Sequence, residues 1–311
     1  MARLARYAWC VLIYNLAVIA WGAYVRATGS GAGCGAHWPL CNGEVIVRPK
    51  TLEMLIEFSH RATSGLALIS VVVLFLWARR ITEPGHPVRT GATLSLVFMV
   101  SEALLGAGLV LFQLVANDAS AARAFAVGAH LLNTFLLLAA MTLAVHWASG
   151  GAPVRMDSRR DGFSRFMLGV VALLIVSMAG AITALGDTLF PSSTLAAGLS
   201  ADLSATSHFL IRLRTIHPVL AVMVSIYLGS AVLQMGRVSV RGALARTILW
   251  LIAAQLAAGI INVVMLAPVW LQLLHLLLAD LVWITYVFLG AELLADAAPV
   301  RVVPDAVPQR A

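Results

Sequence analysis

The chain has 311 residues, of which 61% are hydrophobic and only 11% are charged. This composition excludes an ordinary soluble protein, in which about a quarter of the residues are charged. The net charge of +7 is compatible with nucleic-acid binding, but the basic residues cluster beside long apolar segments. We therefore expect membrane lipid, and no nucleic acid, to surround the protein.

Eight segments are long and apolar enough to cross a bilayer, since roughly 18 or more nearly uncharged residues span its core as a helix. Backbone polar groups must pair within each segment in lipid, which selects helices. The predicted helices are Ala8–Arg26, Glu53–Ala78, Gly91–Phe112, Phe125–Trp147, Phe163–Leu185, Arg214–Met235, Leu244–Leu266 and Trp270–Leu293. The sequence predicts an all-α integral membrane protein with eight transmembrane helices.

Lys and Arg are unevenly distributed between the two sides of these helices. With a cytoplasmic N-terminus, fourteen of the 21 Lys and Arg residues lie on that side, among them Arg3, Arg79 and Arg159. Basic loops are normally retained inside the cell. We therefore expect a multi-pass protein with both termini in the cytoplasm.

The two halves of the chain share several landmarks. "GAYVRATG" at 22–29 and "GAITALG" at 180–186 end the first and fifth helices, and "EALLG" at 102–106 parallels "QLAAG" at 255–259. Matches in the same order indicate a duplicated four-helix unit, with both copies in one orientation because each has an even number of helices. The expected layout is two tandem pseudo-symmetric four-helix bundles at 1–147 and 163–294, a cytoplasmic linker at 148–162 and a cytoplasmic tail at 295–311.

Four of the eight His residues lie near the external starts of the even-numbered helices: His60, His130, His217 and His275. Polar residues at that depth usually face the bundle interior. Two His from facing helices can bind a flat macrocycle from both axial sides, which predicts one haem-sized site per half. A His that only hydrogen-bonds between helices is the alternative. For the other four, His37, His86, His146 and His208, we expect solvated or interfacial positions.

Arginines gather near these His on the otherwise arginine-poor external side. The candidates for binding haem propionates are Arg26, Arg61, Arg212 and Arg214. Guanidinium groups suit this role because they pair with carboxylates in a bidentate manner. Interfacial snorkelling is the alternative for each.

An acidic residue distinguishes the two halves. Glu57 precedes His60 by three residues and shares its helix face, whereas Arg214 takes that place before His217. The difference suggests a reactive site in the first half and an electron-transfer or structural site in the second. A glutamate favoured by the helix dipole is the alternative.

Two further acids lie deeper in the predicted helices. Glu102 aligns with Gln255 across the repeat, which predicts a shared interhelical hydrogen-bonding position. Asp280 follows His275 by five residues and so does not share its helix face. We assign neither acid to chemistry.

The loop "TGSGAGCGAHWPLCNG" at 28–43 carries two cysteines seven positions apart. Zinc normally takes four ligands, and one nearby His leaves that set incomplete. The predicted topology places the loop outside the cytoplasm, where disulfides persist. A structural disulfide and a redox pair both remain open. The third cysteine, Cys10, lies in the first helix, where we expect it to be buried.

Together, this loop and "EFSHR" at 57–61 resemble haem A synthases, bacterial-type cell-membrane enzymes, and the resemblance covers essentially the whole chain. It implies that a methyl group of haem O is oxidised to a formyl group by successive hydroxylations, giving haem A for terminal oxidases. His60 and His130 would be the axial ligands of haem O, and His217 and His275 those of haem b. Glu57 would be catalytic, as a base for water or by stabilising positive charge.

The resemblance also implies a Cys34–Cys41 disulfide within the external loop over 27–52, with a structural or additional redox role. The second half has no equivalent cysteine pair. The implied partners are haem O, an unspecified electron acceptor, the haem O synthase and a second copy of the chain. A bis-histidine membrane cytochrome b that relays electrons without modifying haem is the alternative function.

Overall fold

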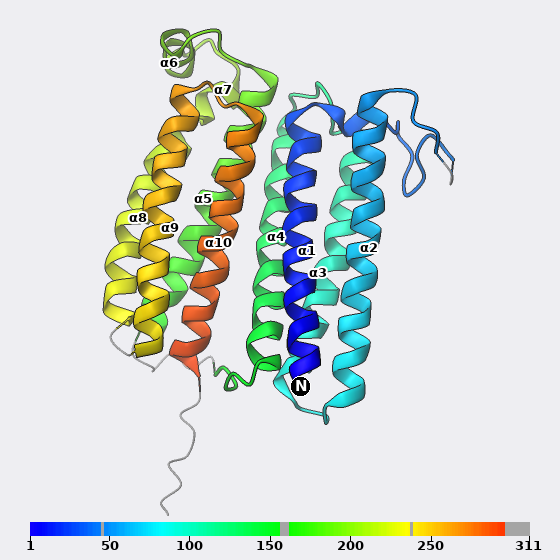
Figure 1. The fold of residues 1–311 in the computed structure, drawn as a ribbon. Coiled ribbons are helices and arrows are strands. Elements are labelled where there is room, and N and C mark those ends of the chain that lie inside the picture. Colours follow the sequence, from blue (N-terminus) through cyan, green and yellow to red (C-terminus); the bar gives the residue numbers. More distant parts are fainter. Residues whose placement is uncertain (45–46, 156–161, 237–238, 296–311) are drawn as a thin grey trace, which may run out of the picture.

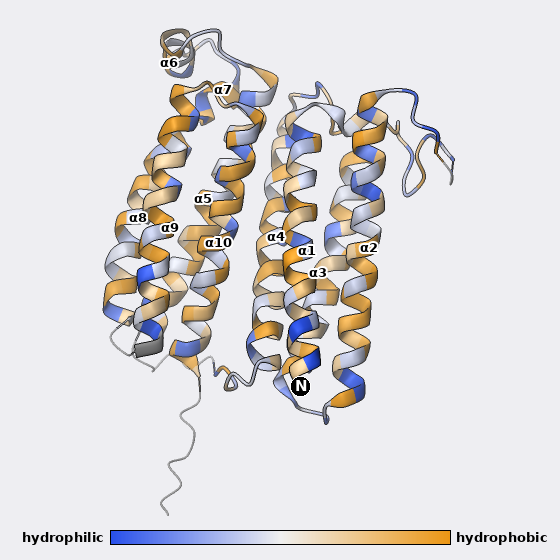
Figure 2. Ribbon diagram, viewed as in Figure 1, coloured by the Kyte–Doolittle hydropathy of each residue, from blue (hydrophilic) through white to orange (hydrophobic). Residues whose placement is uncertain are grey.

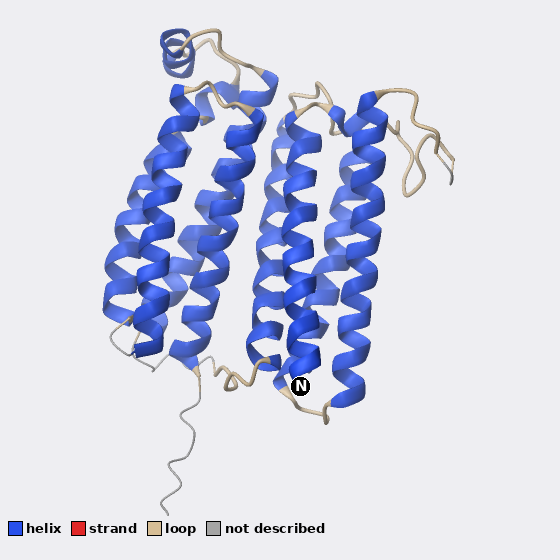
Figure 3. Cartoon of the chain, viewed as in Figure 1, coloured by secondary structure: helices blue, strands red, loops and turns tan. Residues whose placement is uncertain are grey.

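The computed structural model describes residues 1–44, 47–155, 162–236 and 239–295. Its regular elements are helical (Figure 3). They are α1 Ala2–Ala27, η1 Ser30–Ala32, α2 Leu52–Ile81, α3 Pro87–Leu111, α4 Ala121–Ala148, α5 Phe163–Leu189, α6 Leu195–Leu203, α7 Phe209–Leu213, α8 Ile216–Met235, α9 Ser239–Val264 and α10 Val269–Leu294. Among the described residues, 8 spans are long and apolar enough to cross a membrane, which confirms the predicted class.

Local sequence signals fix several helix starts. The Thr51 hydroxyl accepts a hydrogen bond from the Met54 amide at 3.2 Å, and the Ser120 hydroxyl accepts one from the Arg123 amide at 3.1 Å. Both are N-caps that satisfy a free amide of the first turn. Pro87 occupies the first position of α3, where its missing N–H costs nothing.

The sixth predicted helix consists of two consecutive helical elements. The short helix α7 ends at Leu213, and α8 begins at Ile216. The guanidinium of Arg214 is engaged with two carboxylates at this point. The backbone of Arg214 and Thr215 stays in the right-handed helical region, and Phe209–Met235 is long and apolar enough as one span to cross a membrane, so the sixth predicted span is confirmed with an earlier start.

The helices form two groups (Figure 1). Contacts join α1 to α2 and α4, and α3 to α2 and α4; in the second half, α5 and α9 each contact α8 and α10. Across the halves, the Trp283 indole on α10 donates to the Phe135 carbonyl on α4 at 2.7 Å. These contacts follow the order that a duplicated unit would produce, and the duplication stays a prediction.

Apolar residues dominate the helices, and many of the polar residues lie near the helix ends (Figure 2). Large side chains such as Leu66, Phe125 and Ile226 are exposed on the isolated chain. A continuous apolar surface of this kind suits lipid as the surrounding solvent. Cys10 is exposed, so its expected burial was wrong: the α1 face that bears it is turned away from the other helices.

The linker start folds back against the helix ends. His146 is buried, with Nε2 at 3.3 Å from the Ala152 carbonyl and Nδ1 at 3.8 Å from the Glu292 carboxylate on α10. The Trp147 indole donates to the same carbonyl at 3.2 Å. The expectation of a solvated His146 is therefore wrong, because the linker and α10 cover it, and its interfacial position stays a prediction. The described chain ends beside α10 on the side where α1 begins (Figure 1).

Candidate functional site

Two of the four predicted His residues face each other in the second half. The rings of His217 on α8 and His275 on α10 lie perpendicular, with their centroids 6.3 Å apart. His217 Nδ1 lies 3.1 Å from the Val176 carbonyl on α5, which orients the ring. The structure thus brings together one His from each of two facing helices, as an axial pair requires.

Glycines on α1 and α5 provide the space for two of the His rings. A Cβ atom added to Gly22 would lie 2.8 Å from His60 Cε1, and one added to Gly180 would lie 2.9 Å from His217 Cε1. Carbon atoms do not approach this closely, so a side chain here would displace the ring. Gly22 and Gly180 begin the "GAYVRATG" and "GAITALG" landmarks, so each landmark packs against a His.

The second landmark pair has the same relation to the other two His residues. A Cβ atom on Gly259 would lie 3.1 Å from His275 Cε1, and one on Gly106 would lie 3.9 Å from His130 Cε1. Each half therefore packs two His on its even-numbered spans against two glycines on its odd-numbered spans.

Three of these rings carry an unused buried nitrogen. The Nδ1 atoms of His60, His130 and His275 are buried and have no hydrogen-bond partner among the described residues. Buried polar atoms are normally paired, so each such atom points to a missing partner. Buried imidazole nitrogens with a glycine beside each ring, facing each other in the pair His217 and His275, fit a haem bound by two His.

The acid predicted to bond between helices lies next to a His. Glu102 on α3 accepts hydrogen bonds from Asn133 Nδ2 and Thr134 Oγ1 on α4, both at 2.5 Å. Its Oε1 is 3.5 Å from His130 Nδ1. The predicted interhelical hydrogen bonds are present, and the approach to His130 was not anticipated.

The loop over 28–43 is closed by a disulfide between Cys34 and Cys41, and both residues are buried. A Cβ atom on Gly33 would lie 2.5 Å from the α2 backbone at Glu53 and Met54. Glycine is therefore required where the loop meets the start of α2. The loop lies directly against the helix that carries His60.

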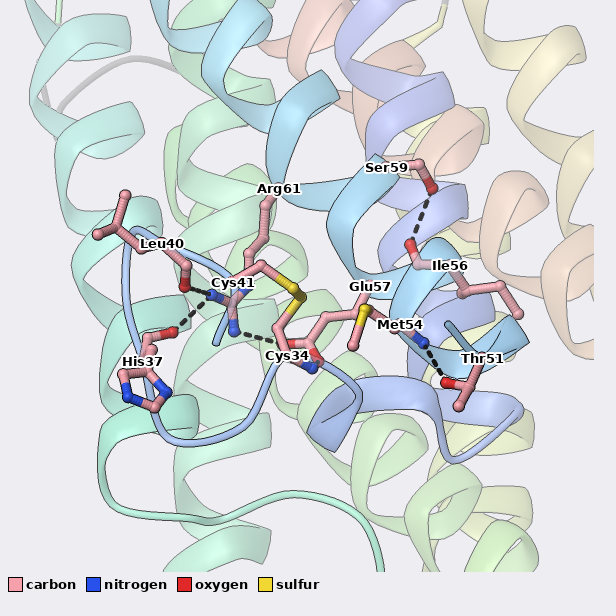
Figure 4. The surroundings of a disulfide bond; sticks show 10 residues. All are labelled: Cys34, His37, Leu40, Cys41, Thr51, Met54, Ile56, Glu57, Ser59 and Arg61. Carbon is pink, nitrogen blue, oxygen red and sulfur yellow. Dashed lines mark hydrogen bonds and ion pairs between the residues drawn. A yellow bond between two sulfur atoms is a disulfide. The ribbon is translucent and has the colours of Figure 1, made fainter. Parts of the chain in front are cut away.

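Glu57 and Arg61 fasten this loop to α2 (Figure 4). The buried Glu57 carboxylate accepts the Cys34 amide at 2.7 Å and the Arg61 guanidinium at 2.5 Å. Arg61 also donates to the carbonyls of His37 and Leu40, both at 2.6 Å. Glu57 thus lies one helical turn from His60, and its charge is balanced by Arg61.

The remaining candidate arginines have different surroundings. Arg26 crosses between the halves, donating to the Ala184 carbonyl at 2.7 Å, Thr188 Oγ1 at 2.8 Å and Gln272 Oε1 at 3.0 Å. Arg212 is exposed. Arg214 is buried and pairs with two acids.

Arg214 pairs with Asp187 at the end of α5 at 3.0 Å and with Asp202 on α6 at 3.1 Å. Neither acid was predicted from the sequence to pair with Arg214. Asp187 directly follows the "GAITALG" landmark, and this position beside a repeated motif could have identified it as a candidate. The second half therefore holds its α6 segment with ion pairs to Arg214, where the first half holds its loop with a disulfide and Glu57–Arg61.

The chain matches the family model of the COX15-CtaA cytochrome oxidase assembly proteins over residues 5–287. It belongs to this family. It is 52% identical over 300 residues to a protoheme IX farnesyltransferase of Thermus thermophilus, covering 96% of this chain and 49% of that protein. It is 38% identical over 155 residues to a heme A synthase of Halalkalibacterium halodurans, covering 50% of each. The chain spans about half the length of these relatives.

The COX15-CtaA match encloses all of the residues that carry the candidate site. It extends from α1, before Gly22, to α10, beyond His275. Membership thus agrees with the resemblance drawn from the Cys loop and "EFSHR". The matched residues include all four candidate His ligands.

Proposed function

We propose that the chain is a haem A synthase that oxidises a methyl group of haem O to a formyl group. A relative named heme A synthase supports the substrate class. The His–Gly arrangement in both halves supports two haem-binding positions. His60 and His130 would hold the substrate haem O, while His217 and His275 would hold haem b.

One observation supports an enzyme over a simple electron relay: among the described residues, the ion-pair contact between a candidate His ligand and a carboxylate lies in the first half. Glu57 lies a turn from His60, and Glu102 lies 3.5 Å from His130. The counterparts in the second half are Arg214 and Gln255. A relay needs no such difference between two otherwise matched sites.

Each oxidation of the methyl carbon would release two electrons, which an electron acceptor would take up. A methyl group and water give a hydroxymethyl group, two electrons and two protons. A second round gives an aldehyde hydrate, which loses water to leave the formyl group. Haem b, when bound, would supply one-electron redox chemistry. Glu57 would accept a proton from water or stabilise positive charge at the reacting carbon.

The surroundings of the site follow from this proposal. The Cys34–Cys41 loop would cover the first-half site on the external side, with both chain termini in the cytoplasm of a bacterial-type cell. The Thermus relative is named for farnesyl transfer to protoheme IX, and this chain matches 49% of it. We therefore propose the haem O synthase as a partner, alongside the electron acceptor and a second copy of the chain.

Extraction of the pigments from the purified protein tests this function. Chromatography is expected to separate haem B together with haem O or haem A. Haem B alone, with no O or A even after haem O is supplied, would favour the cytochrome b relay instead.

Gly22→Ala is expected to remove haem from the first half and leave the second-half haem in place. The added methyl group would meet His60 Cε1 at 2.8 Å, whereas Gly65 on α2 has open space around its Cα. Gly65→Ala is therefore the matched control and should retain both haems. Haem content per protein, with the absorption spectrum of each variant, measures the difference. Equal haem loss in both variants would contradict the packing role of Gly22.

A further inference from the structure

Glu102 is a fixed carboxylate beside one of the proposed haem ligands. Two donors from α4, Asn133 Nδ2 and Thr134 Oγ1, hold its two oxygens at 2.5 Å. Asn133 also donates to the Phe98 carbonyl on α3 at 2.9 Å, which ties the same side chain to both helices. The position of the carboxylate is therefore set by α3 and α4 together.

The contact between Glu102 and His130 has a defined geometry. Glu102 Oε1 is 3.5 Å from His130 Nδ1, and this nitrogen has no hydrogen-bond partner among the described residues. A shift of a few tenths of an ångström would bring the two atoms within hydrogen-bond distance. With the Nδ1–H directed to the carboxylate, Nε2 is the nitrogen left to bind iron.

The same place in the second half holds an uncharged side chain. Gln255 on α9 has its Nε2 at 3.3 Å from His275 Nε2, and its Oε1 is buried without a partner among the described residues. Both Glu102 and Gln255 lie four residues before the glycine that packs on the neighbouring His. The two halves thus differ by one charge at equivalent positions.

We propose that Glu102 is a positioning residue for His130, and that its charge makes the first-half iron easier to oxidise than the second-half iron. The proposal rests on the proposed function in taking these His residues as haem ligands. A carboxylate that accepts the N–H of a ligating His orients the ring and raises its basicity. The more basic ligand favours the ferric state, whereas the neutral Gln255 meets His275 through its amide nitrogen, a donor, and so does not accept an N–H from that ring.

The difference would direct electrons between the halves. In the loaded protein, the first-half haem would give up one electron and the second-half haem would take it up. Electrons released during methyl oxidation would therefore leave the substrate half. The identity of the residues at 102 and 255, and not the His quartet shared by both halves, would set this direction.

A redox titration of the full chain loaded with haem B tests the role of Glu102. Low-spin signals would be followed by electron paramagnetic resonance, and His60→Ala identifies the first-half component by its loss. Glu102→Gln is expected to raise the midpoint potential of that component alone. We expect about a tenfold change in the ferric-to-ferrous ratio at fixed potential, which corresponds to about 59 mV for one electron.

Two further variants separate charge from structural support. Gln255→Glu is expected to lower the second-half potential and leave the first unchanged. Thr134→Val removes a donor to Glu102 but keeps its charge, so the first-half potential should not rise. Unchanged potentials in Glu102→Gln, or a similar rise in Thr134→Val, would overturn the proposal. If Glu102→Gln fails to hold haem, an unchanged second-half potential in Gln255→Glu would overturn it.

This titration does not depend on conversion of haem O. A shifted first-half potential in a protein that never forms haem A would contradict the proposed function and keep the role of Glu102. Conversion of haem O by the wild-type protein, together with unchanged potentials in Glu102→Gln and Gln255→Glu, would support the proposed function and contradict the role of Glu102.

Discussion

His217→Ala and His275→Ala are each expected to abolish the low-spin haem spectrum of the second half. The two rings face each other at 6.3 Å, so each variant removes one member of the axial pair. Conversion of haem O should fall by at least about 100-fold, because changes to groups that only support a ligand already cost about 10- to 100-fold. Absorption spectra and chromatographic measurement of haem A formation provide the two readouts.

The matched control for these variants is His37→Ala. The His37 side chain is exposed, and only its backbone carbonyl is used, as an acceptor for Arg61. This variant should keep both haem signals and near-normal conversion. If His217→Ala and His275→Ala both left the resident spectrum unchanged, the second-half site would be wrong.

Glu57→Gln is expected to lower haem O conversion by about 100-fold or more, the range typical for loss of a general base. Glutamine has nearly the same size and can still accept the Cys34 amide through its carbonyl oxygen. The variant removes the charge that faces Arg61 and the ability to take up a proton. Conversion would be compared with the haem content and thermal unfolding of the same preparation.

The comparison separates chemistry from support of the loop. Normal haem content with low conversion would place Glu57 in the reaction. Cys34→Ser combined with Cys41→Ser is the control for the loop, since it breaks the covalent closure and keeps the Glu57 carboxylate. Full conversion by Glu57→Gln would contradict the proposed role of Glu57.

The spans and the His quartet could be predicted from the sequence because their signals are local. A long apolar segment implies a helix in lipid, and a His residue within such a segment stands out in the sequence itself. The two halves could likewise be compared through short landmarks such as "EALLG" and "QLAAG". The glycines in those landmarks prove to be the residues that pack against His.

The partners of the charged groups could not be predicted in the same way. Arg26 bonds to residues of α5 and α10, and Arg214 joins two acids from separate elements. Such contacts depend on how the halves pack, which no local pattern specifies. The approach of Glu102 to His130 similarly depends on the register of α3 against α4. Cys10 and His146 were misplaced because their burial is set by neighbouring helices and the linker.

The central claim is that the first half oxidises haem O, and conversion by the purified full-length protein tests it most directly. Haem O would be added with a one-electron acceptor, and the haems would be extracted and separated by chromatography, with His60→Ala as the blank. We expect a hydroxylated intermediate followed by haem A in the wild-type sample, and unchanged haem O in the blank. Haem O recovered unchanged from wild-type protein that holds both haems would contradict it.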